Sequence, residues 1–336
     1  MKKIIIPIIV LLAIVAGAGV WLYNSFYGNC VKERHSLFVY AKYPYEQVAD
    51  SVEQYIGKKW AYDIYAKRLD LPSTVKAGHY VLEEGMSVIE VVRMLKLGLQ
   101  TPVNVTMNNV KTPAYLAGKL SRQLHADSVE LVTVLNDKKL AEKYGFSSPL
   151  TMFSIFIPNT YEFYWTVKPE EFVDRMFKEY KRFWTPERDK KRERSGLNRV
   201  EVSTLASIVY EETRKVDEMP RVAGVYVNRL KQGIPLQADP TIKYAMQDFG
   251  LRRILYRHLK YESPYNTYLH RGLPPSPICM PSIDAIEAVL NYEKHDYIFF
   301  CARPTFDGYH NFARTLKEHN ANAKAYQAEL NKRKIR

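Results

Sequence analysis

The sequence predicts an α+β protein with an N-terminal apolar helix, a small α+β module and a larger α+β domain. Three observations carry this prediction. Residues 4–23 contain no charged side chain. Strand-like runs and amphipathic helical patterns alternate between residues 36 and 107. From residue 198 onward a helical period dominates, and two short apolar strands follow within residues 297–313. A chain of 336 residues has room for two or three small domains with a proper core.

The apolar segment is long enough to cross a bilayer, which takes about 20 residues. After Lys2 and Lys3 the next charged residue is Lys32, and this asymmetry places the N-terminus in the cytoplasm. A cleaved signal peptide is the alternative, with residues 16–18 as an A-x-A-like site. The length of the span and the aromatic residues at its end favour an uncleaved membrane anchor that comprises residues 1–27. The aromatic residues are Trp21, Tyr23 and Tyr27.

Composition narrows the classes of partner. The formal net charge of +13 suits an anionic partner such as nucleic acid, acidic lipid or a cell-wall polymer. The three cysteines have no C-x-x-C spacing, so no disulfide framework is expected, although a single Cys279–Cys301 bridge stays open. The eight histidines contain no H-x-x-x-H pair. We therefore expect no metal site and no cofactor.

Residues 28–145 are expected to form a small α+β module with a linking region, and residues 146–197 a connecting segment. The run at 190–194 is the best nucleic-acid candidate, but acids interrupt it and no glycine-aromatic motif accompanies it. A solvated helix explains this run, so we expect no nucleic-acid partner. The predicted elements are strands at 36–41 and 103–107, helices at 45–56 and 126–135, and a strand, turn and helix within 76–98.

A helix that begins after Asn198 carries the strongest candidate for chemistry. Asn198 and Glu201 have the spacing of a capping box. The apolar stripe of this helix leads to Glu212, whereas Glu211 points to the opposite, solvated side. Burial would raise the pKa of Glu212, and a carboxyl that stays protonated near neutrality can act as a general acid. The stripe consists of Val202, Leu205, Ala206 and Val209.

A structural role for Glu212 is the alternative. In that case it would pair with Arg221 or Arg229 on the second helix, predicted at residues 220–232, and only hold the fold. Gly233 supplies a left-handed stop for this helix. The extended piece at 236–241 then ends in a turn at Asp239 and Pro240, and its polar side chains suit either ligand contact or turn formation.

Five motifs follow one another with short gaps in this half of the chain. They read LASIVYEET at 205–213, VNRL at 227–230, LQADPT at 236–241, YNTY at 265–268 and GLPPSPI at 272–278. In this order the motifs resemble the endolytic murein transglycosylase family (MltG/YceG-like), over residues 198–313 and more weakly back to about residue 80.

The resemblance implies that Glu212, the second glutamate of the first motif, is the catalytic acid. One departure is Tyr210, where family members often carry glutamate. The resemblance also implies that residues 198–336 form the transglycosylase catalytic domain. It implies a LysM-like module within residues 28–145 that helps to hold a glycan chain, although a purely structural module is equally compatible with the sequence.

The reaction implied is cleavage of peptidoglycan between N-acetylmuramic acid and N-acetylglucosamine. Glu212 would protonate the glycosidic oxygen, and the 6-hydroxyl of the sugar would close a 1,6-anhydro ring without water. If the enzyme were instead a hydrolase, Asp239 would be its second carboxylate. The expected substrate-binding residues are Asn228, Gln237, Asp239, Tyr265, Asn266 and Thr267.

We expect a single-pass protein of the cytoplasmic membrane with its catalytic domain outside. Its partners would be peptidoglycan glycan strands, the inner membrane and, by family analogy, cell-wall synthases. A membrane-anchored scaffold that binds peptidoglycan without cleaving it is the alternative from another class. His310, near the second strand, either borders the cleft or satisfies a position in the core.

Overall fold

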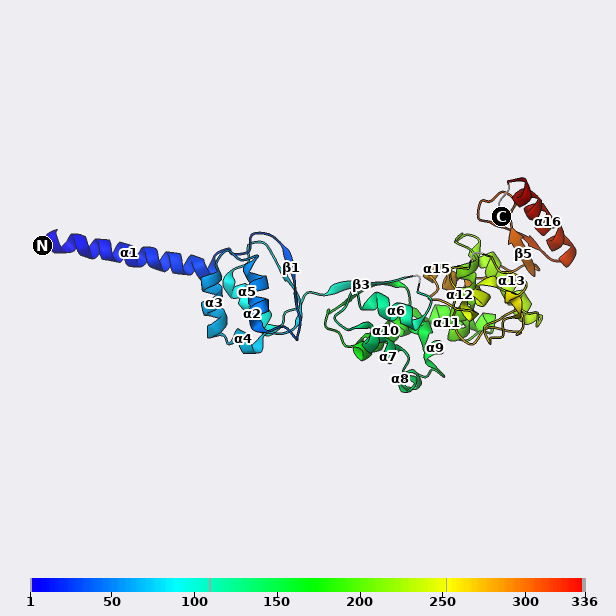
Figure 1. Ribbon diagram of the computed structural model, residues 1–336, viewed down its shortest axis with the longest axis horizontal. Coiled ribbons are helices and arrows are strands. Elements are labelled where there is room, and N and C mark those ends of the chain that lie inside the picture. Colours follow the sequence, from blue (N-terminus) through cyan, green and yellow to red (C-terminus); the bar gives the residue numbers. More distant parts are fainter. Residues whose placement is uncertain (1, 109, 252, 334–336) are drawn as a thin grey trace. The chain divides into compact units, whose positions relative to one another are not determined.

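The computed structural model describes residues 2–108, 110–251 and 253–333 (Figure 1). The fold is α+β, as predicted. It is mostly helical, and the strands in these ranges form three small two-stranded sheets. The chain divides into two compact units. The first contains residues 1–105, 123–125 and 161–167, and the second contains residues 106–122, 126–160 and 168–336. The predicted boundaries at 145 and 197 stay predictions.

The first unit holds the apolar helix α1 (Lys2–Tyr27) and a small sheet. The antiparallel strands β1 (His35–Val39) and β2 (Gly78–Leu82) pair with Leu37 opposite Tyr80. The predicted strands and the helices α2 and α5 are confirmed. Helices α3 and α4 were missed, because the stretch KWAYDIYAKR has only small or polar-tipped residues on its buried face. The helices of this unit after α1 are α2 (Tyr45–Glu53), α3 (Lys59–Arg68), α4 (Leu71–Thr74) and α5 (Val88–Leu97).

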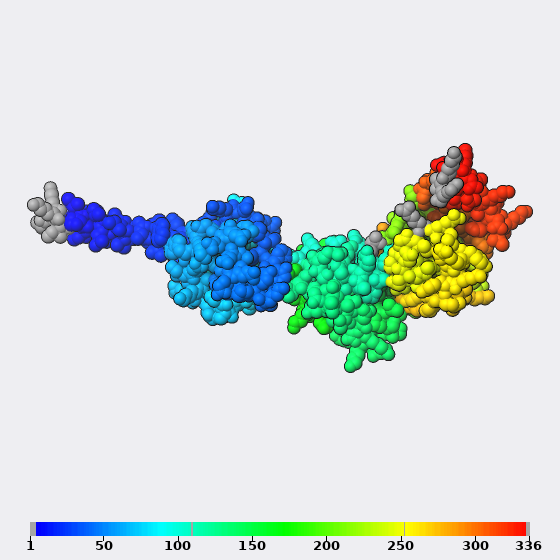
Figure 2. Space-filling view, in the orientation of Figure 1, coloured from blue at the N-terminus to red at the C-terminus, as the bar shows by residue number. Residues whose placement is uncertain are grey.

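One helix among the described residues, α1, is long and apolar enough to cross a membrane. The candidate span is Ile5–Tyr27, with a mean hydropathy of 2.7. Its side chains have no protein cover over most of this length, as Figure 2 shows for the face in view. Either a membrane anchor or a signal sequence fits these properties.

The second unit begins with short helices and the strand β4, and a longer helical pair follows. Strand β3 (Val103–Met107) pairs with β4 (Asn159–Phe163), and the division between the units falls within both strands. The other elements here are α6 (Pro113–Leu120), α7 (Ser128–Leu135), α8 (Lys138–Lys143), α9 (Pro149–Met152), η1 (Phe153–Ile155), α10 (Pro169–Phe183) and α11 (Pro186–Ser195).

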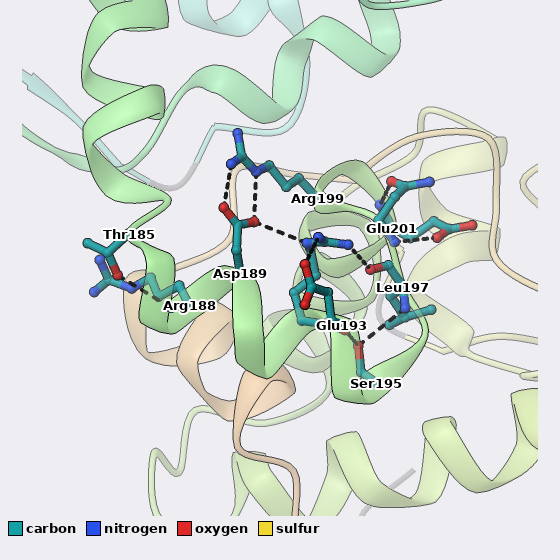
Figure 3. A network of polar contacts seen from close by, with 10 residues as sticks. Thr185, Arg188, Asp189, Glu193, Ser195, Leu197, Arg199 and Glu201 are labelled. Carbon is teal, nitrogen blue, oxygen red and sulfur yellow. Dashed lines mark hydrogen bonds and ion pairs between the residues drawn. The ribbon is translucent and has the colours of Figure 1, made fainter.

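The charge run lies on α11, and ion pairs within the unit hold much of it. Figure 3 shows Asp189 facing Arg199 at the start of the next helix, with 3.0 Å between Arg199 Nε and Asp189 Oδ1. Within the run, Arg192 donates to Asp189 and Lys191 forms an ion pair with Glu187 at 3.0 Å. These ion pairs indicate that part of the charge run stabilises the fold of the second unit.

The centre of the second unit is α12 (Arg199–Glu212), which packs against α13, α14 and α15. The predicted capping box is confirmed, with Asn198 Oδ1 2.9 Å from Glu201 N and Glu201 Oε2 2.7 Å from Asn198 N. The remaining elements are α13 (Met219–Lys231), α14 (Asp239–Ala245), η2 (His258–Lys260), α15 (Ile283–Leu290), β5 (Phe299–Ala302), β6 (His310–Ala313) and α16 (Leu316–Lys332).

Three local predictions need correction. Glu211 is not a solvated charge: its side chain is only 17% exposed and forms an ion pair with Lys111, because α12 is covered on several sides. The strand β5, which the apolar run at 297–302 predicts to be buried, is only half-buried, and β6 lies beside it and pairs with it antiparallel. The turn predicted at Asp239 is the first turn of the short helix α14. All three cysteines are free thiols.

Candidate active site

A cavity of about 390 Å³ in the second unit collects side chains from seven segments. Its wall is formed by the end of α12, the body of α13, the loop before α14, the start of α14, the loop between η2 and α15, strand β5 and the first turn of α16. The lining residues are Glu212, Tyr226, Arg229, Leu236, Gln237, Asp239, Tyr268, Phe299, Phe300, Leu316 and His319.

Glu212 is the last residue of α12, and its carboxyl group lies at the cavity wall. The Tyr226 hydroxyl donates a hydrogen bond of 2.7 Å to Glu212 Oε1. Burial raises the pKa of Glu212 to about 7 and the charge of Asp239 adds to this rise, whereas the Tyr226 bond opposes it. The carboxyl can therefore hold a proton near neutral pH and release it there.

The ion pairs proposed as an alternative for Glu212 do not form among the described residues. Arg221 pairs instead with Glu293, at 3.0 Å. Arg229 faces the cavity but donates to backbone carbonyls and to an amide oxygen. Glu212 thus has a tyrosine as its hydrogen-bond partner and no ion pair among the described residues, and burial raises its pKa by more than the charges of His310 and Lys243 lower it.

Asp239 is the second carboxyl at the cavity, and it also has a tyrosine partner. The Tyr268 hydroxyl donates to Asp239 Oδ1 over 2.6 Å. Burial and this contact hold the pKa of Tyr268 above its usual range, so the phenol stays a donor. One cavity thus contains two carboxyl groups, each fixed by a phenolic hydroxyl.

Gln237 shapes the cavity through its backbone as well as its side chain. Its φ of 53° lies in the left-handed region, which costs free energy for a residue with a side chain. The Thr267 carbonyl accepts from Gln237 N at 3.0 Å, and Gln237 Oε1 accepts from Arg229 at 3.2 Å. These contacts hold the strained residue in place, as is common at functional sites.

The other predicted substrate-binding residues lie away from the cavity lining and have protein partners. The Asn228 amide donates to the carbonyls of His295 and Tyr297, and Asn266 donates to two loop carbonyls. Tyr265 bonds Ser276 Oγ at 2.6 Å, and Thr267 Oγ1 accepts from Ala238 N at 3.0 Å. These four residues order the loops around the site, and their contact with substrate stays a prediction.

His310 is likewise outside the lining. Its Nδ1 lies 2.8 Å from Glu218 Oε2, and its backbone N–H donates to the other oxygen of this buried carboxylate. Its position fits the structural alternative raised for it. The acid–imidazole pair ties β6 to the start of α13.

The C-terminal elements build one wall of the cavity, which the sequence alone did not predict. Phe299 stacks on His319, with ring centroids 5.2 Å apart, and Leu316 extends this wall. Nδ1 of His319 is buried without a hydrogen-bond partner among the described residues, and burial and the charge of Arg229 lower its pKa. A helix pattern alone shows which residues share a face but not which cavity the face borders.

No group of three or more metal-ligating side chains is arranged to hold an ion within the described ranges. The site is best described as a proton donor and acceptor beside a fixed carboxylate. Apolar side chains from β5 and α16 form the facing wall. This combination suits acid–base chemistry on a neutral, polar substrate with hydroxyl groups.

The raised pKa of Glu212 predicts a pH-dependent cost in stability. The unfolded carboxyl ionises near pH 4.5 and the folded one near pH 7, so stability falls across this window and levels off above it. We expect Glu212→Gln to be more stable than the natural chain by at most about 3 kcal/mol at pH 8 and equally stable near pH 4.5. Unfolding midpoints at both pH values test this. An equal difference at the two values would contradict the raised pKa.

Comparison with known proteins adds a family to this geometry. The sequence model of the YceG-like family matches residues 38–325. An endolytic murein transglycosylase of Bacillus subtilis is 27% identical over 277 residues, which cover 78% of this chain and 76% of that protein. An endolytic murein transglycosylase of Streptococcus pneumoniae is 26% identical over 302 residues, which span only 54% of its length.

A solved structure is also similar. The crystal structure of a yceG-like protein from Listeria monocytogenes matches with a TM-score of 0.57 and 26% identity. The match covers 86% of this chain and 99% of that one. The likeness therefore extends over both units.

Proposed function

The chain belongs to the YceG-like family, and on that premise we propose that it is a membrane-anchored endolytic lytic transglycosylase. Its substrate would be the glycan strands of peptidoglycan, cut at the β-1,4 bond between N-acetylmuramic acid and N-acetylglucosamine. The observation that carries this proposal is Glu212, a carboxyl with a pKa near 7 and a tyrosine donor, at the wall of a cavity. The names of the B. subtilis and S. pneumoniae relatives support the substrate class.

Glu212 would act first as an acid and then as a base. It donates its proton to the glycosidic oxygen as the bond from that oxygen to C1 of the muramic acid breaks. The electron-poor C1 is then captured by the 6-hydroxyl oxygen of the same sugar, and Glu212 removes the hydroxyl proton. The proton returns to the enzyme and the product ends in a 1,6-anhydro ring, so neither water nor a cofactor is consumed.

Other groups of the cavity would assist this step. The Asp239 carboxylate, fixed by Tyr268, would stabilise the positive charge that develops at C1. Gln237 would bind hydroxyl or N-acetyl groups. The faces of the sugar rings would pack against the wall of Phe299, Phe300 and Leu316.

The first unit supports a proposal for substrate retention and location. In this unit α2, α3 and α4 lie between the antiparallel strands β1 and β2, and α5 follows β2 after a short turn. We propose that it serves as a LysM-like module that holds the glycan strand. Helix α1 would anchor the chain in the cytoplasmic membrane with the catalytic domain outside. Contact with cell-wall synthases is proposed by family analogy alone.

A second candidate is a muramidase, because Asp239 shares the cavity with Glu212. In a hydrolase Asp239 would serve as nucleophile or as base for a water molecule, and Asp239→Asn would abolish cleavage as fully as Glu212→Gln. In the transglycosylase Asp239→Asn would slow the reaction but leave the anhydro product unchanged. Product analysis after digestion of purified murein by both full-length variants in detergent separates the two.

The pH dependence of cleavage follows from the protonated state that the reaction needs. We expect kcat/KM to fall about tenfold per pH unit above a midpoint near pH 7, because Glu212 then loses its proton. Since the Tyr226 bond lowers the pKa of Glu212, Tyr226→Phe should move the falling limb to higher pH. Initial rates between pH 5 and pH 9 test this. If kcat/KM falls at the same pH in the natural chain and in Tyr226→Phe, Glu212 is not the group whose ionisation causes the fall.

A further inference from the structure

The outer end of α1 is built into the first unit and is not connected to it by a flexible linker. Ser25 is buried, and Phe26 packs against the core of the unit. Lys58 Nζ donates to the carbonyl oxygens of Asn24 and Gly28 at the end of the helix, and Asn24 O also accepts from Gly28 N. Residues that follow the helix at once, Cys30 and Val31, belong to the same core. A membrane that holds α1 therefore also orients this unit.

A pair of stacked tryptophans fixes the position of helix α3 along the length of α1. Trp21 lies in the candidate span and stacks on Trp60 of α3, with ring centroids 4.9 Å apart and planes 7° from parallel. Phe26 meets the edge of Trp60 at 5.7 Å. Figure 1 shows α3 running across the end of α1. If α1 crosses the bilayer, α3 lies along its surface at the level of Trp21.

The face of α3 turned away from the core suits that position. Trp60 is 39% exposed and Ile64 is 55% exposed, and they lie one helical turn apart. Lys67 and Arg68 extend the same face by another turn, and neither has an ion pair within the described part of the chain. The one acid on this face, Asp63, is paired with Lys59 at 3.5 Å. Apolar residues followed by free cations are typical of a helix in the membrane interface.

We propose that α3 is an interfacial helix that docks the first unit on the outer leaflet of the membrane that α1 spans. Trp60 and Ile64 enter the boundary between headgroups and acyl chains, and Lys67 and Arg68 contact the phosphates of anionic lipids. The occupant of this face is the bilayer itself, because the Trp21–Trp60 stack makes the face continuous with the span. The inference rests on the proposed anchor and is independent of the proposed reaction.

The test places a reporter on this face in the full-length chain. Ile64→Cys is labelled with an environment-sensitive fluorophore in a Cys301→Ser background, because Cys30 and Cys279 are buried and their raised thiol pKa makes them unreactive. Ser36→Cys, on the exposed side of β1, is the matched control. Both proteins are reconstituted in phosphatidylglycerol vesicles, with and without lipid that carries a nitroxide near its headgroup.

We expect the Ile64 label to emit at shorter wavelength and to be quenched about twofold or more by the nitroxide lipid, with little effect on the Ser36 label. Changing Lys67 and Arg68 to glutamate should reduce the quenching. Equal behaviour of the two labels in floated vesicles overturns the docking. A blue shift without quenching, which disappears as the protein is diluted in lipid, assigns the face to a second copy and also overturns it. A chain that does not float with vesicles disproves the anchor, and this inference with it.

Discussion

Glu212→Gln is expected to lower kcat for glycan cleavage by about 10²- to 10⁴-fold while changing KM little. Glutamine keeps the shape of the side chain and the oxygen that accepts from Tyr226, so the cavity is preserved. It cannot donate a proton to a glycosidic oxygen or take one from a hydroxyl. Rates of release of soluble fragments from purified murein, with the full-length protein in detergent, provide the measurement.

The adjacent carboxyl supplies the control for this change. Glu211→Gln removes the same charge one residue earlier, but Glu211 pairs with Lys111 on the other side of α12. We expect this variant to lose some stability and to keep its activity within a few-fold of the natural chain. If Glu212→Gln cleaves murein as fast as Glu211→Gln does, Glu212 is not the catalytic acid. If neither variant nor the natural chain cleaves murein, the scaffold hypothesis is supported.

Arg229→Met is expected to destabilise the second unit by about 3 to 5 kcal/mol. The guanidinium of Arg229 is buried and donates to the carbonyls of Ile298, Pro235 and Leu236 at 2.6, 2.9 and 3.0 Å. It therefore joins the start of β5 to the loop that carries Gln237. Methionine fills the space but leaves these acceptors without donors, and each buried acceptor left unpaired is costly.

Two further variants make this a matched comparison on one helix. Arg229→Lys should recover only part of the loss, because one ammonium group cannot bridge both segments. Arg221→Met removes a half-exposed ion pair with Glu293 and should cost less than about 1 kcal/mol. Urea midpoints of the three proteins measure the difference. If the urea midpoint of Arg229→Met is no lower than that of Arg221→Met, the hydrogen bonds of the buried Arg229 guanidinium do not stabilise the fold.

Local sequence patterns predicted much of α12 and α13, the two helices that carry Glu212 and Tyr226. The capping box at Asn198, the apolar stripe of α12 and the stop at Gly233 are set by neighbours in sequence, so they could be read without the fold. The direction of Glu212 followed from the same stripe. The prediction that Glu211 is solvated was wrong, because Lys111, which pairs with its side chain, is far away in the sequence.

The rest of the cavity depends on contacts between distant segments. Leu316 and His319 lie in a mostly basic and polar stretch at the C-terminal end of the sequence, and only the packing of α16 against β5 brings them to the cavity. The amide of Asn266 resembled a ligand contact, yet it donates to the carbonyls of Leu259 and Tyr261. A short polar loop satisfies its own backbone as often as it binds a ligand, and residue types alone do not separate these uses.

The origin of the oxygen at the new chain end shows whether the 6-hydroxyl group or water captures C1. Purified murein is digested by the full-length protein in heavy-oxygen water, and the fragments are analysed by mass spectrometry. We expect 1,6-anhydro-muramic ends that are lighter than reducing ends by one water and carry no heavy oxygen, and that are absent with Glu212→Gln. Reducing ends that carry one heavy oxygen would contradict it, because water would then be the nucleophile and Asp239 its partner in a hydrolase.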